Sequence, residues 1–521
     1  MVDGNQHNVR ICVPVCERTL PELEQTAMRA AEAGDLVELR LDCLDDPASL
    51  RLGQLADVTR RFERPVIVTF RAKEQGGGGA ANFANLASRR QFWARHSESF
   101  KEELIDLELD MVQQLVDNPI TSVDWKRVIC SHHDFEGVPS DLDQIYERMR
   151  ATPAGILKIA VKAGDITDCI PVFHLLKRAR VEGQEVIAIA MGPAGVATRI
   201  LGPSCGAYLT YGALDGENST APGQVTAGQL RDLYRIDQIT AQTRIMGLVG
   251  LPVGHSISPQ IQNTSFAAAG ADAVYLPFAV RDITSFMRRM AHPRTRELDW
   301  NLRGLSVTAP HKTAVIDCLD WIDPPAKEIG AVNTIVIEAD RLCGYNTDAT
   351  AVLKPVNQKL GSLRDARCAI IGAGGAASAA LWSLKQESAN ATLFVRNEEK
   401  GSALAERFGA GCEQLDGAHF KGFDVVINAT PLGTLGSFEG ETAASAVQLG
   451  GARLAYDLVY NPSDTLFLRQ AREAGCDTIG GLAMLVLQGV EQFRLWTGIE
   501  ASVEVMREAA ERAVKDFRSE I

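Results

Sequence analysis

A lysine and a histidine placed late in apolar segments are the residues of the first half best suited to chemistry. Lys158 lies inside the apolar run 155–161, and His133 ends a similar run. Burial should lower the pKa of Lys158, because desolvation disfavours the ammonium. A neutral amine attacks ketones to form a Schiff base, and a nearby histidine can move protons. The alternative is that Lys158 extends to solvent and His133 is an ordinary strand-end residue.

A second lysine, in the other half, ends the segment 304–312. Lys312 and Asp348, which is predicted in a loop before a helix, would form an acid/base pair if both lay in one cleft. As isolated residues they would be surface charges. Ser256 and Ser258, two positions apart in a predicted loop, suit a polyhydroxylated ligand, or they cap a helix that begins at Pro259.

Residues 368–381 have the strand-turn-helix pattern of a dinucleotide-binding fingerprint. Gly372, Gly374 and Ala377 fill its three small positions. Gly372 permits a tight turn, Gly374 allows the backbone to approach a pyrophosphate, and the helix N-terminus favours the phosphates. The alternative is a glycine-rich turn that holds nothing. The predicted cofactor-binding residues of this turn are Gly372, Ala373, Gly374, Gly375 and Ala376.

The next predicted strand, 391–397, bears on the choice of cofactor. An enzyme that uses NAD places an acid at the end of this strand, to bind the ribose hydroxyls. Val395 and Arg396 stand there instead, with Lys400 one helical turn further. These cations favour a 2′-phosphate and therefore NADP(H), unless Glu398 and Glu399 oppose them rather than face solvent.

Alternating strands and helices must position the residues of the first half. Strands alternating with helices predict a parallel sheet, and eight units in this length predict a closed (β/α)8 barrel, with an open doubly wound sheet as the alternative. Catalytic groups in such barrels lie at the carboxyl ends of the strands. Glu38, Arg40, Arg71, Asp106 and Glu108 lie late in the runs or just after them. The eight predicted strands are 9–15, 36–42, 65–70, 103–109, 127–133, 155–163, 185–192 and 207–213, with helices such as 20–33, 140–150 and 166–180.

Composition limits the possible classes of protein. A length of 521 residues predicts two or three domains, and a net charge of −13 argues against a nucleic-acid partner. We find no apolar run of 18 residues and no signal-peptide pattern, so a cytoplasmic protein without a membrane partner is expected. Eleven cysteines without CxxC pairs predict reduced thiols and no metal site. Oligomeric state does not follow from the sequence.

The first half resembles type I 3-dehydroquinate dehydratase in the segments 37–42, 131–135, 157–160, 198–200 and 220–224. The resemblance implies a β/α barrel that removes water from 3-dehydroquinate through a Schiff base on Lys158, with His133 as general acid/base. It also implies that Glu38 and Arg40 contact substrate hydroxyls, that Arg71 lines the pocket and that Arg199 clamps the carboxylate, while Thr220 and Gln224 belong to a lid. One departure is Gln75, which stands where relatives have a glutamate, with Glu74 before it. Either the loop that carries Glu74 and Gln75 is shifted, or the contact made by the glutamate of the relatives is replaced.

The second half resembles shikimate dehydrogenase in the segments 256–258, 306–312, 330–334, 346–348, 428–433, 460–462 and 481–489. The resemblance implies that Lys312 and Asp348 are the catalytic pair, and that a hydride from NADPH reduces 3-dehydroshikimate while Lys312 supplies a proton. The substrate would be held by Ser256, Ser258, Thr308, Asn333, Tyr460 and Gln488. Leu458 and Gly481 would face the nicotinamide. Departures from the usual pattern are Ser306, Ala349, Val395, Asn397 and Thr434.

Together the resemblances predict a bifunctional enzyme of aromatic amino-acid biosynthesis. Its expected domains are a barrel over 1–240 and a two-lobed α/β dehydrogenase over 241–521. The substrate lobe would cover about 244–350 plus the helices after 488, and a Rossmann-type NADP lobe about 351–487. An alternative is that the second half acts on quinate instead of or beside shikimate. A non-catalytic sensor of pathway intermediates is a further alternative, against which Lys158, His133, Lys312 and Asp348 argue.

Overall fold

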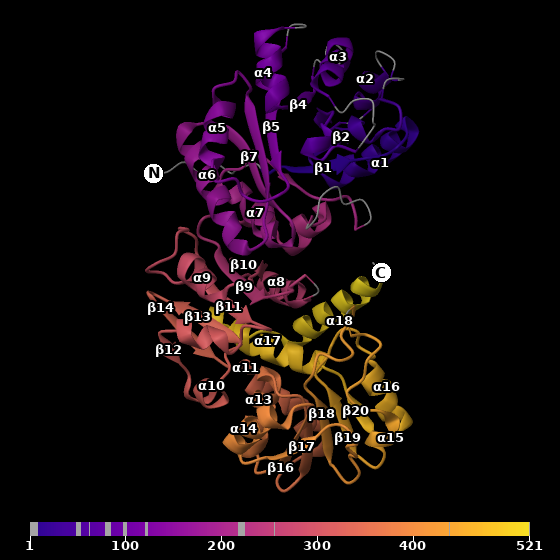
Figure 1. Cartoon of the computed structure of the whole chain (residues 1–521), viewed down its shortest axis with the longest axis vertical. Coiled ribbons are helices and arrows are strands. Elements are labelled where there is room, and N and C mark those ends of the chain that lie inside the picture. Colours follow the sequence, from indigo (N-terminus) through magenta and orange to yellow (C-terminus); the bar gives the residue numbers. More distant parts are fainter. Residues whose placement is uncertain are drawn as a thin grey trace. The chain divides into compact units, whose positions relative to one another are not determined.

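The computed structural model describes residues 9–519, apart from 48–49, 51–53, 62, 79–84, 97–99, 101, 120–122, 217–223, 255 and 437. The chain divides into two compact units, the first built mainly from residues up to Thr243 and the second mainly from Arg244 onward (Figure 1). None of the helices in the described ranges is long and apolar enough to cross a membrane.

The first unit is a parallel eight-stranded sheet in the order β7-β6-β5-β4-β3-β2-β1-β8. Just before β8, the Tyr208 N–H donates to the Val186 carbonyl on β7, which joins the two ends of the sheet. The sheet is therefore a nearly closed (β/α)8 barrel, as predicted, and the open-sheet alternative is wrong. The strands are β1 (Ile11–Val15), β2 (Leu36–Arg40), β3 (Val66–Thr69), β4 (Leu104–Glu108), β5 (Val128–Asp134), β6 (Ile156–Lys162), β7 (Glu185–Met191) and β8 (Thr210–Tyr211).

Local capping fixes where the barrel helices begin and end. Helix α1 begins at Leu20, because Thr19 and Glu22 form a capping box. The segment 225–239 has apolar residues at helical spacing, which predicts one continuous last helix. That prediction is wrong, because Arg235 has a φ of 51° and separates a π-helix, Gln229–Leu233, from a short turn, Ile236–Gln238. The α-helices are α1 (Leu20–Ala33), α2 (Gln54–Thr59), α3 (Leu86–His96), α4 (Leu109–Asp117), α5 (Leu142–Arg150), α6 (Cys169–Glu182) and α7 (Val196–Leu201).

The second unit begins with a mixed sheet in the order β10-β9-β11-β13-β14-β12. β9 and β11 are parallel, whereas β13 is antiparallel to both β11 and β14. Its strands are β9 (Arg244–Gly250), β10 (Ala273–Ala279), β11 (Leu302–Val307), β12 (Trp321–Ile322), β13 (Thr334–Glu338) and β14 (Arg341–Tyr345). Its helices are α8 (Ser258–Ala268), α9 (Ile283–Phe286), α10 (Pro324–Ile329), α11 (Thr347–Val352) and α12 (Lys354–Leu360), with α17 (Leu482–Thr497) and α18 (Val503–Ser519) from the C-terminal end of the chain.

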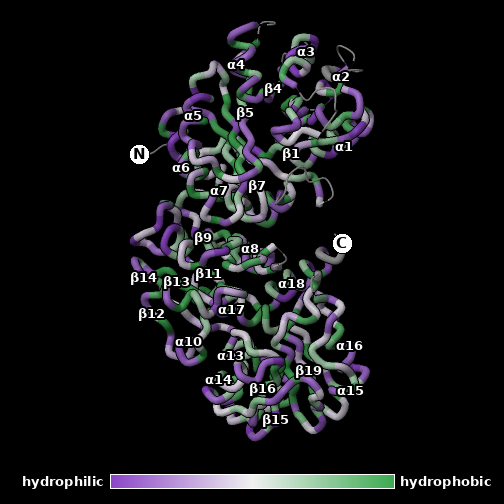
Figure 2. Tube along the Cα trace, in the orientation of Figure 1, coloured by the Kyte–Doolittle hydropathy of each residue, from purple (hydrophilic) through white to green (hydrophobic). Residues whose placement is uncertain are grey.

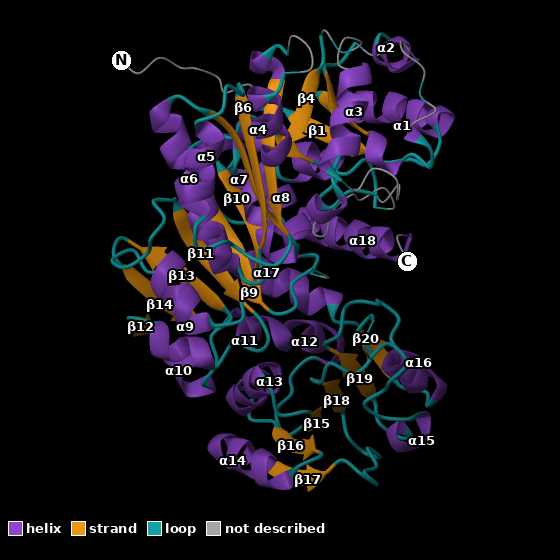
Figure 3. Ribbon diagram, turned by 45° about the horizontal axis from the view of Figure 1, so that its top comes forward, coloured by secondary structure: helices purple, strands orange, loops and turns teal. Residues whose placement is uncertain are grey.

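The second sheet of this unit is parallel throughout, in the order β17-β16-β15-β18-β19-β20. Counted from β15, this is the 3-2-1-4-5-6 order of dinucleotide-binding folds. Its strands are β15 (Arg367–Ile371), β16 (Asn390–Val395), β17 (Gly411–Gln414), β18 (Val425–Asn428), β19 (Leu454–Asp457) and β20 (Asp477–Ile479). The helices are α13 (Gly375–Gln386), α14 (Glu398–Phe408), α15 (Ala446–Leu449) and α16 (Leu466–Glu473), and Figure 3 shows α13 and α14 on the opposite side of this sheet from α15 and α16.

Hydrophobic residues on both faces explain why this sheet is buried between helices. Cys368 and Ile370 pack with α13 and α14, whereas the alternate residues Ala369 and Ile371 pack with α15 and α16. Figure 2 shows hydrophobic residues along the strands, for example in β5 of the barrel. Continuous apolar strands between alternating helices are the pattern from which the α/β class was predicted.

Candidate active sites

The inner face of the barrel changes from apolar to polar toward the carboxyl ends of its strands. One buried layer contains Leu36, Ile67, Ile129, Ile156 and Ile187. Because side chains alternate along a strand, the residues two positions further point to the same interior. They are Glu38, Thr69, Ser131, Lys158 and Ile189, and Asp106 joins them from β4. Strand periodicity therefore places the charged groups together above an apolar base.

The Lys158 amine contacts three oxygen atoms in this layer. It lies 3.0 Å from Asp106 Oδ2, 3.3 Å from Glu38 Oε1 and 2.8 Å from the Tyr211 hydroxyl. The lysine is 6% exposed. The sequence predicted a lone amine in an apolar strand, but the structure surrounds it with two carboxylates and a phenol.

Asp106 is held by a cation other than Lys158. The Arg71 guanidinium donates to both carboxylate oxygens of Asp106, at 2.9 and 2.6 Å, and Ser131 Oγ donates to the same group at 2.6 Å. Burial alone would raise the pKa of Asp106, but the positive charges of Arg71 and Lys158 outweigh burial and hold this pKa well below its ordinary value. Asp106 is therefore a permanent carboxylate with two cationic partners.

His133 lies beside this cluster and is partly buried, in surroundings that favour the neutral imidazole. Burial and the nearby Arg71 and Lys158 charges hold the pKa of His133 well below its ordinary value. Among the described residues, no group hydrogen-bonds to its Nδ1. The Gln75 side-chain oxygen accepts the His133 backbone N–H at 2.7 Å, and Gln75 lines the cavity whereas Glu74 is exposed. Of the two alternatives, this arrangement favours the one in which Gln75 replaces the glutamate of the relatives, rather than the one in which the loop is shifted.

Arg199 supplies a buried positive charge to the same cavity. Its Nε has no hydrogen-bond partner, and no carboxylate pairs with its guanidinium, within the ranges that the structure describes. Burial lowers its pKa to about 10, so it remains a cation at neutral pH. The cavity is lined by Pro14, Glu38, Arg40, Arg71, Gln75, Gly76, His133, Phe135, Lys158, Ala160, Ile189, Met191, Arg199, Tyr211 and Gln224. Of the dehydratase residues predicted from sequence, Thr220 lies outside the described residues.

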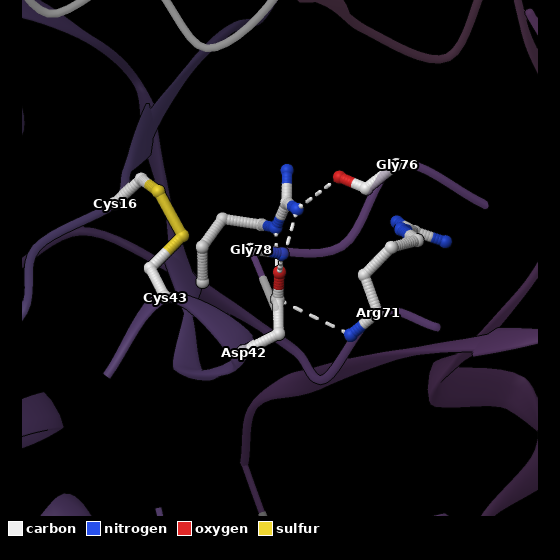
Figure 4. Close-up of a disulfide and its surroundings, with 7 residues drawn as sticks. Cys16, Asp42, Cys43, Arg71, Gly76 and Gly78 are labelled. Atoms are coloured by element: carbon white, nitrogen blue, oxygen red, sulfur yellow. Dashed lines mark hydrogen bonds and ion pairs between the residues drawn. A yellow bond between two sulfur atoms is a disulfide. The ribbon is translucent and has the colours of Figure 1, made fainter. Parts of the chain in front are cut away.

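Arg40 and Asp42 organise the loop that follows β3. Arg40 forms two hydrogen bonds with Asp42, at 3.0 and 2.7 Å, and Asp42 also accepts the N–H groups of Arg71 and Gly78. Figure 4 shows Asp42 between these two backbone groups. This carboxylate therefore fixes the loop that carries Gln75.

A disulfide joins Cys16 and Cys43 beside this loop (Figure 4). The expectation that the thiols are reduced is wrong for this pair. β1 and β2 are neighbours in register, so the segments after them bring two cysteines, 27 residues apart in sequence, to a Cα separation of 5.4 Å. Sequence spacing does not reveal this proximity, because it arises from strand pairing. The other nine cysteines are free.

In the second unit, Lys312 and Asp348 form one ion pair with a separation of 2.6 Å. The amide of Asn333 donates to the other carboxylate oxygen of Asp348 at 2.8 Å and to Thr347 Oγ1 at 3.0 Å. Asp348 lies in the first turn of α11 rather than in a preceding loop, because Asn346 caps the helix and it begins at Thr347. The pair predicted from sequence is thus brought together.

The predicted substrate residues of this unit lie on elements from distant parts of its sequence. Ser256 Oγ contacts Ser258 Oγ at 3.1 Å and accepts the Ser258 N–H, so neither serine side chain caps α8. Tyr460 follows β19, and its side chain lies near Ser256. Thr308 follows β11, and Gln488 on α17 donates to the Leu485 carbonyl of its own helix.

The glycine turn after β15 fits a dinucleotide phosphate group. Gly372 has a φ of 111°, and a Cβ there would lie 2.9 Å from Thr430. A Cβ on Gly374 would meet no described atom within 4 Å, which leaves backbone open at the start of α13, with Ala373, Gly375 and Ala376 around it. Oriented N–H groups at a helix start bind phosphates. The small residues therefore serve two needs: a left-handed turn and an uncovered helix terminus.

The remaining predicted cofactor residues lie around this turn. Arg396 follows β16 and is exposed, as are Glu398 and Glu399; nothing is described of the Lys400 side chain. A Cβ on Gly481 would lie 2.5 Å from the Leu458 carbonyl, so glycine is needed where α17 begins against that backbone. Among the described residues, no cluster of three or more His, Cys, Asp or Glu side chains could hold a metal ion.

Comparison with known proteins relates both units to characterised families. The family model for type I 3-dehydroquinase matches residues 11–241, and the models for the shikimate dehydrogenase substrate-binding domain and the shikimate 5′-dehydrogenase C-terminal domain match 248–335 and 481–511. A bifunctional 3-dehydroquinate dehydratase/shikimate dehydrogenase, chloroplastic, from Arabidopsis thaliana is 34% identical over 95% of this chain and 83% of its own length. The chain belongs to this bifunctional family.

Individual relatives of the second unit are similar over nearly their full length. A shikimate dehydrogenase (NADP(+)) from Methanocaldococcus jannaschii is 36% identical over 52% of this chain and 97% of that protein. A crystal structure of a shikimate dehydrogenase in complex with NADP+ is 36% identical, with a TM-score of 0.49, over 53% of this chain and 97% of the other.

As a member of this family, the chain combines a lyase unit and an oxidoreductase unit that act on small molecules. The sequence did not indicate a role for two residues that contact the Lys158 amine, Tyr211 and Asp106. Asp106 was visible as a charge inside an apolar strand. Nothing in the sequence indicated a role for Tyr211, because an aromatic residue in a β-rich run is expected to belong to the hydrophobic core.

Proposed function

We propose that the barrel dehydrates 3-dehydroquinate to 3-dehydroshikimate and that the second unit reduces this product to shikimate with NADPH. The observation that carries the proposal is the convergence of Lys158, His133 and Arg199 on one cavity. A nucleophilic amine, an imidazole and a cation that has no carboxylate partner among the described residues suit a substrate that carries a ketone and a carboxylate.

In the barrel, the Lys158 amine attacks the ketone and forms an imine with loss of water. The imine withdraws electrons and acidifies the neighbouring C–H bond. His133, whose surroundings lower its pKa and favour the neutral imidazole, removes that proton and returns it to the departing hydroxyl, which leaves as the second water molecule. Hydrolysis of the imine releases 3-dehydroshikimate and regenerates the amine.

Positive charge in the cavity orients this substrate. Arg199 binds the carboxylate, since its guanidinium can form two parallel hydrogen bonds. Glu38 and Arg40 contact ring hydroxyls from β2, and Arg71 holds Asp106 beside the reacting amine. The resemblance to type I 3-dehydroquinate dehydratase implies that Thr220 and Gln224 also contact the ring; Gln224 lines the cavity, and Thr220 lies outside the described residues.

In the second unit, Lys312 donates a proton to the oxygen of the reacting ketone. Asp348 holds the Lys312 amine, and Asn333 holds Asp348. Bound NADPH supplies the hydride. The substrate is held by Ser256, Ser258, Thr308, Tyr460 and Gln488. The cofactor is held by Gly372–Ala376, Arg396, Lys400, Leu458 and Gly481. With the proton and the hydride on opposite ends of the C=O bond, a ketone becomes a secondary alcohol.

We assign the barrel to residues 1–240 and the dehydrogenase to 241–521, with a substrate lobe of about 244–350 plus the helices after 488, and a cofactor lobe of about 351–487. The strand orders of the two sheets in the second unit support this division of lobes. A cytoplasmic location stays a prediction from the sequence. The Arabidopsis relative is named as chloroplastic.

A single-vessel assay tests the proposal. The full chain is given 3-dehydroquinate and NADPH, and absorbance of NADPH and free 3-dehydroshikimate are followed together. We expect NADPH to be consumed and shikimate to form, with a much slower rate when NADH is used. Production of 3-dehydroshikimate without NADPH consumption would contradict the role of the second unit, and no reaction of 3-dehydroquinate would contradict that of the barrel.

A further inference from the structure

Tyr211 is placed where it can take part in the chemistry of the barrel. Its hydroxyl lies 2.8 Å from Lys158 Nζ, and its ring lies 4.4 Å below the same nitrogen. The residue lines the cavity although it is only 5% exposed. Pairing of β8 with β1 fixes its backbone opposite Cys12, so the phenol points to the interior at the level of the amine.

Imine formation requires proton transfers at two atoms of the substrate adduct. When the amine adds to the ketone, a C–N bond forms and the C=O π bond breaks, so the nitrogen must lose a proton and the oxygen must gain one. His133 has a different task, at the carbon beside the imine. A group that takes the proton from the nitrogen and gives one to the oxygen must contact the amine and must itself carry a proton.

Of the three contacts of the Lys158 amine, the phenol meets this requirement best. Asp106 is a permanent carboxylate that is bonded through both oxygens to Arg71, so it has no proton to give. Glu38 accepts a hydrogen bond from Thr69 Oγ1 at 2.6 Å and lies 3.3 Å from the amine. Burial, together with the Glu38 charge, raises the pKa of Tyr211 well above its ordinary value, so its proton is present at neutral pH.

We propose that Tyr211 is a catalytic residue that relays a proton between Lys158 and the substrate oxygen as the imine forms and is hydrolysed. The nitrogen and oxygen of the adduct share one carbon, so a hydroxyl bonded to the nitrogen also reaches the oxygen. The phenol receives the proton of the nitrogen and gives its own to the oxygen, through a six-membered ring of C, N, H, O, H and O. A second transfer along the same path moves the remaining N–H proton to the new hydroxyl, so that the C–O bond breaks, water leaves and a C=N double bond forms.

The relay balances without any other reactant. Tyr211 begins and ends as a neutral phenol, the ketone oxygen leaves as water with both protons of the attacking amine, and a neutral imine forms beside Asp106. Hydrolysis runs the same steps in reverse. The inference rests on the proposed imine at Lys158 and adds a residue to it.

The test compares Tyr211→Phe with a matched control, Tyr146→Phe, in the full chain. Tyr146 is also a buried phenol, with a hydrogen bond of 2.7 Å to Glu182, but it lies on α5 outside the barrel interior. Reaction with 3-dehydroquinate is stopped with borohydride at successive times, and the reduced adduct on Lys158 is measured by mass spectrometry. Binding of quinate, which has the ring hydroxyls and carboxylate but no ketone, reports the integrity of the cavity.

We expect Tyr211→Phe to slow adduct formation and dehydration together by about 100-fold, a typical contribution of acid–base catalysis. Quinate affinity and the dehydrogenase rate should stay within about 3-fold of wild type, as should all rates of Tyr146→Phe. Adduct formation at the wild-type rate, an effect on KM alone, or an equal loss in Tyr146→Phe would each overturn the relay. An absent adduct in the wild type would instead overturn the proposed imine, and the relay with it.

Discussion

Both units of this enzyme contain a lysine–carboxylate pair, yet the roles that we propose for the two lysines need opposite proton chemistry. In the proposed mechanism Lys158 must lose a proton before it attacks a ketone, whereas Lys312 must carry one to donate. Asp106 keeps a second cationic partner, Arg71, when Lys158 becomes neutral. Asp348 has only a neutral amide, from Asn333, as its other side-chain partner in the described structure, so Lys312 balances its charge.

The comparison shows that the neighbours of the pair, rather than the pair itself, select the chemistry. In the barrel, an arginine stabilises the carboxylate and a phenol contacts the amine. In the dehydrogenase, an asparagine orients the carboxylate and the lysine side chain is 22% exposed. A nucleophile benefits from a dry site in which its proton can leave, and a proton donor benefits from access to solvent, which can restore the proton.

The largest expected effect is that of Lys158→Ala. Removal of the nucleophile should reduce dehydration on the order of 10⁴-fold or more, because no other described amine contacts the cavity. Reduction of 3-dehydroshikimate by the same protein should be unchanged. Rates with each substrate measure both effects. Lys162→Ala, an exposed lysine at the end of the same strand, serves as control; if it lost dehydration equally, the effect would be structural.

Lys312→Ala should give the converse result. Loss of the proton donor should lower turnover of 3-dehydroshikimate by about 10³-fold, while NADPH still binds and dehydration continues. NADPH fluorescence titration and the two rates separate these effects. Lys327→Ala, an exposed lysine on α10, is the matched control. Turnover close to wild type in Lys312→Ala would remove this lysine from the mechanism.

The sequence predicted the positions of the two lysines better than it predicted the residues that contact them, and the reason is physical. A lysine in an apolar strand and a glycine turn between strand and helix are local patterns, so the place of Lys158 inside β6 and the turn at Gly372 before α13 were predicted correctly. Seven barrel strands were placed within two residues of their observed ends. Contacts such as Arg71 with Asp106 depend on strands that are adjacent only in the folded barrel.

The errors in the prediction have the same origin. β8 was expected over seven residues and is assigned to Thr210–Tyr211, because this segment hydrogen-bonds first to β7, at Tyr208, and then to β1. The Cys16–Cys43 disulfide depends on the pairing of β1 with β2. Local spacing contains none of this information.

The smallest expected effect concerns cofactor choice. Arg396→Ala should weaken NADPH binding by about 10-fold and leave NADH binding nearly unchanged, because the exposed guanidinium would interact with the 2′-phosphate that only NADPH carries. Titration with both cofactors measures the ratio, and Arg364→Ala, another exposed arginine of this lobe, is the control. Equal weakening of both cofactors would exclude recognition of the 2′-phosphate.

The measurement that tests the central claim most directly is borohydride reduction of the wild-type chain with 3-dehydroquinate, followed by peptide mass spectrometry. The contrast between the two lysines predicts a stable adduct on the peptide that contains Lys158, with Lys312 unmodified. An adduct on Lys312, or an unmodified Lys158 in a protein that still dehydrates its substrate, would contradict the assignment of the nucleophile.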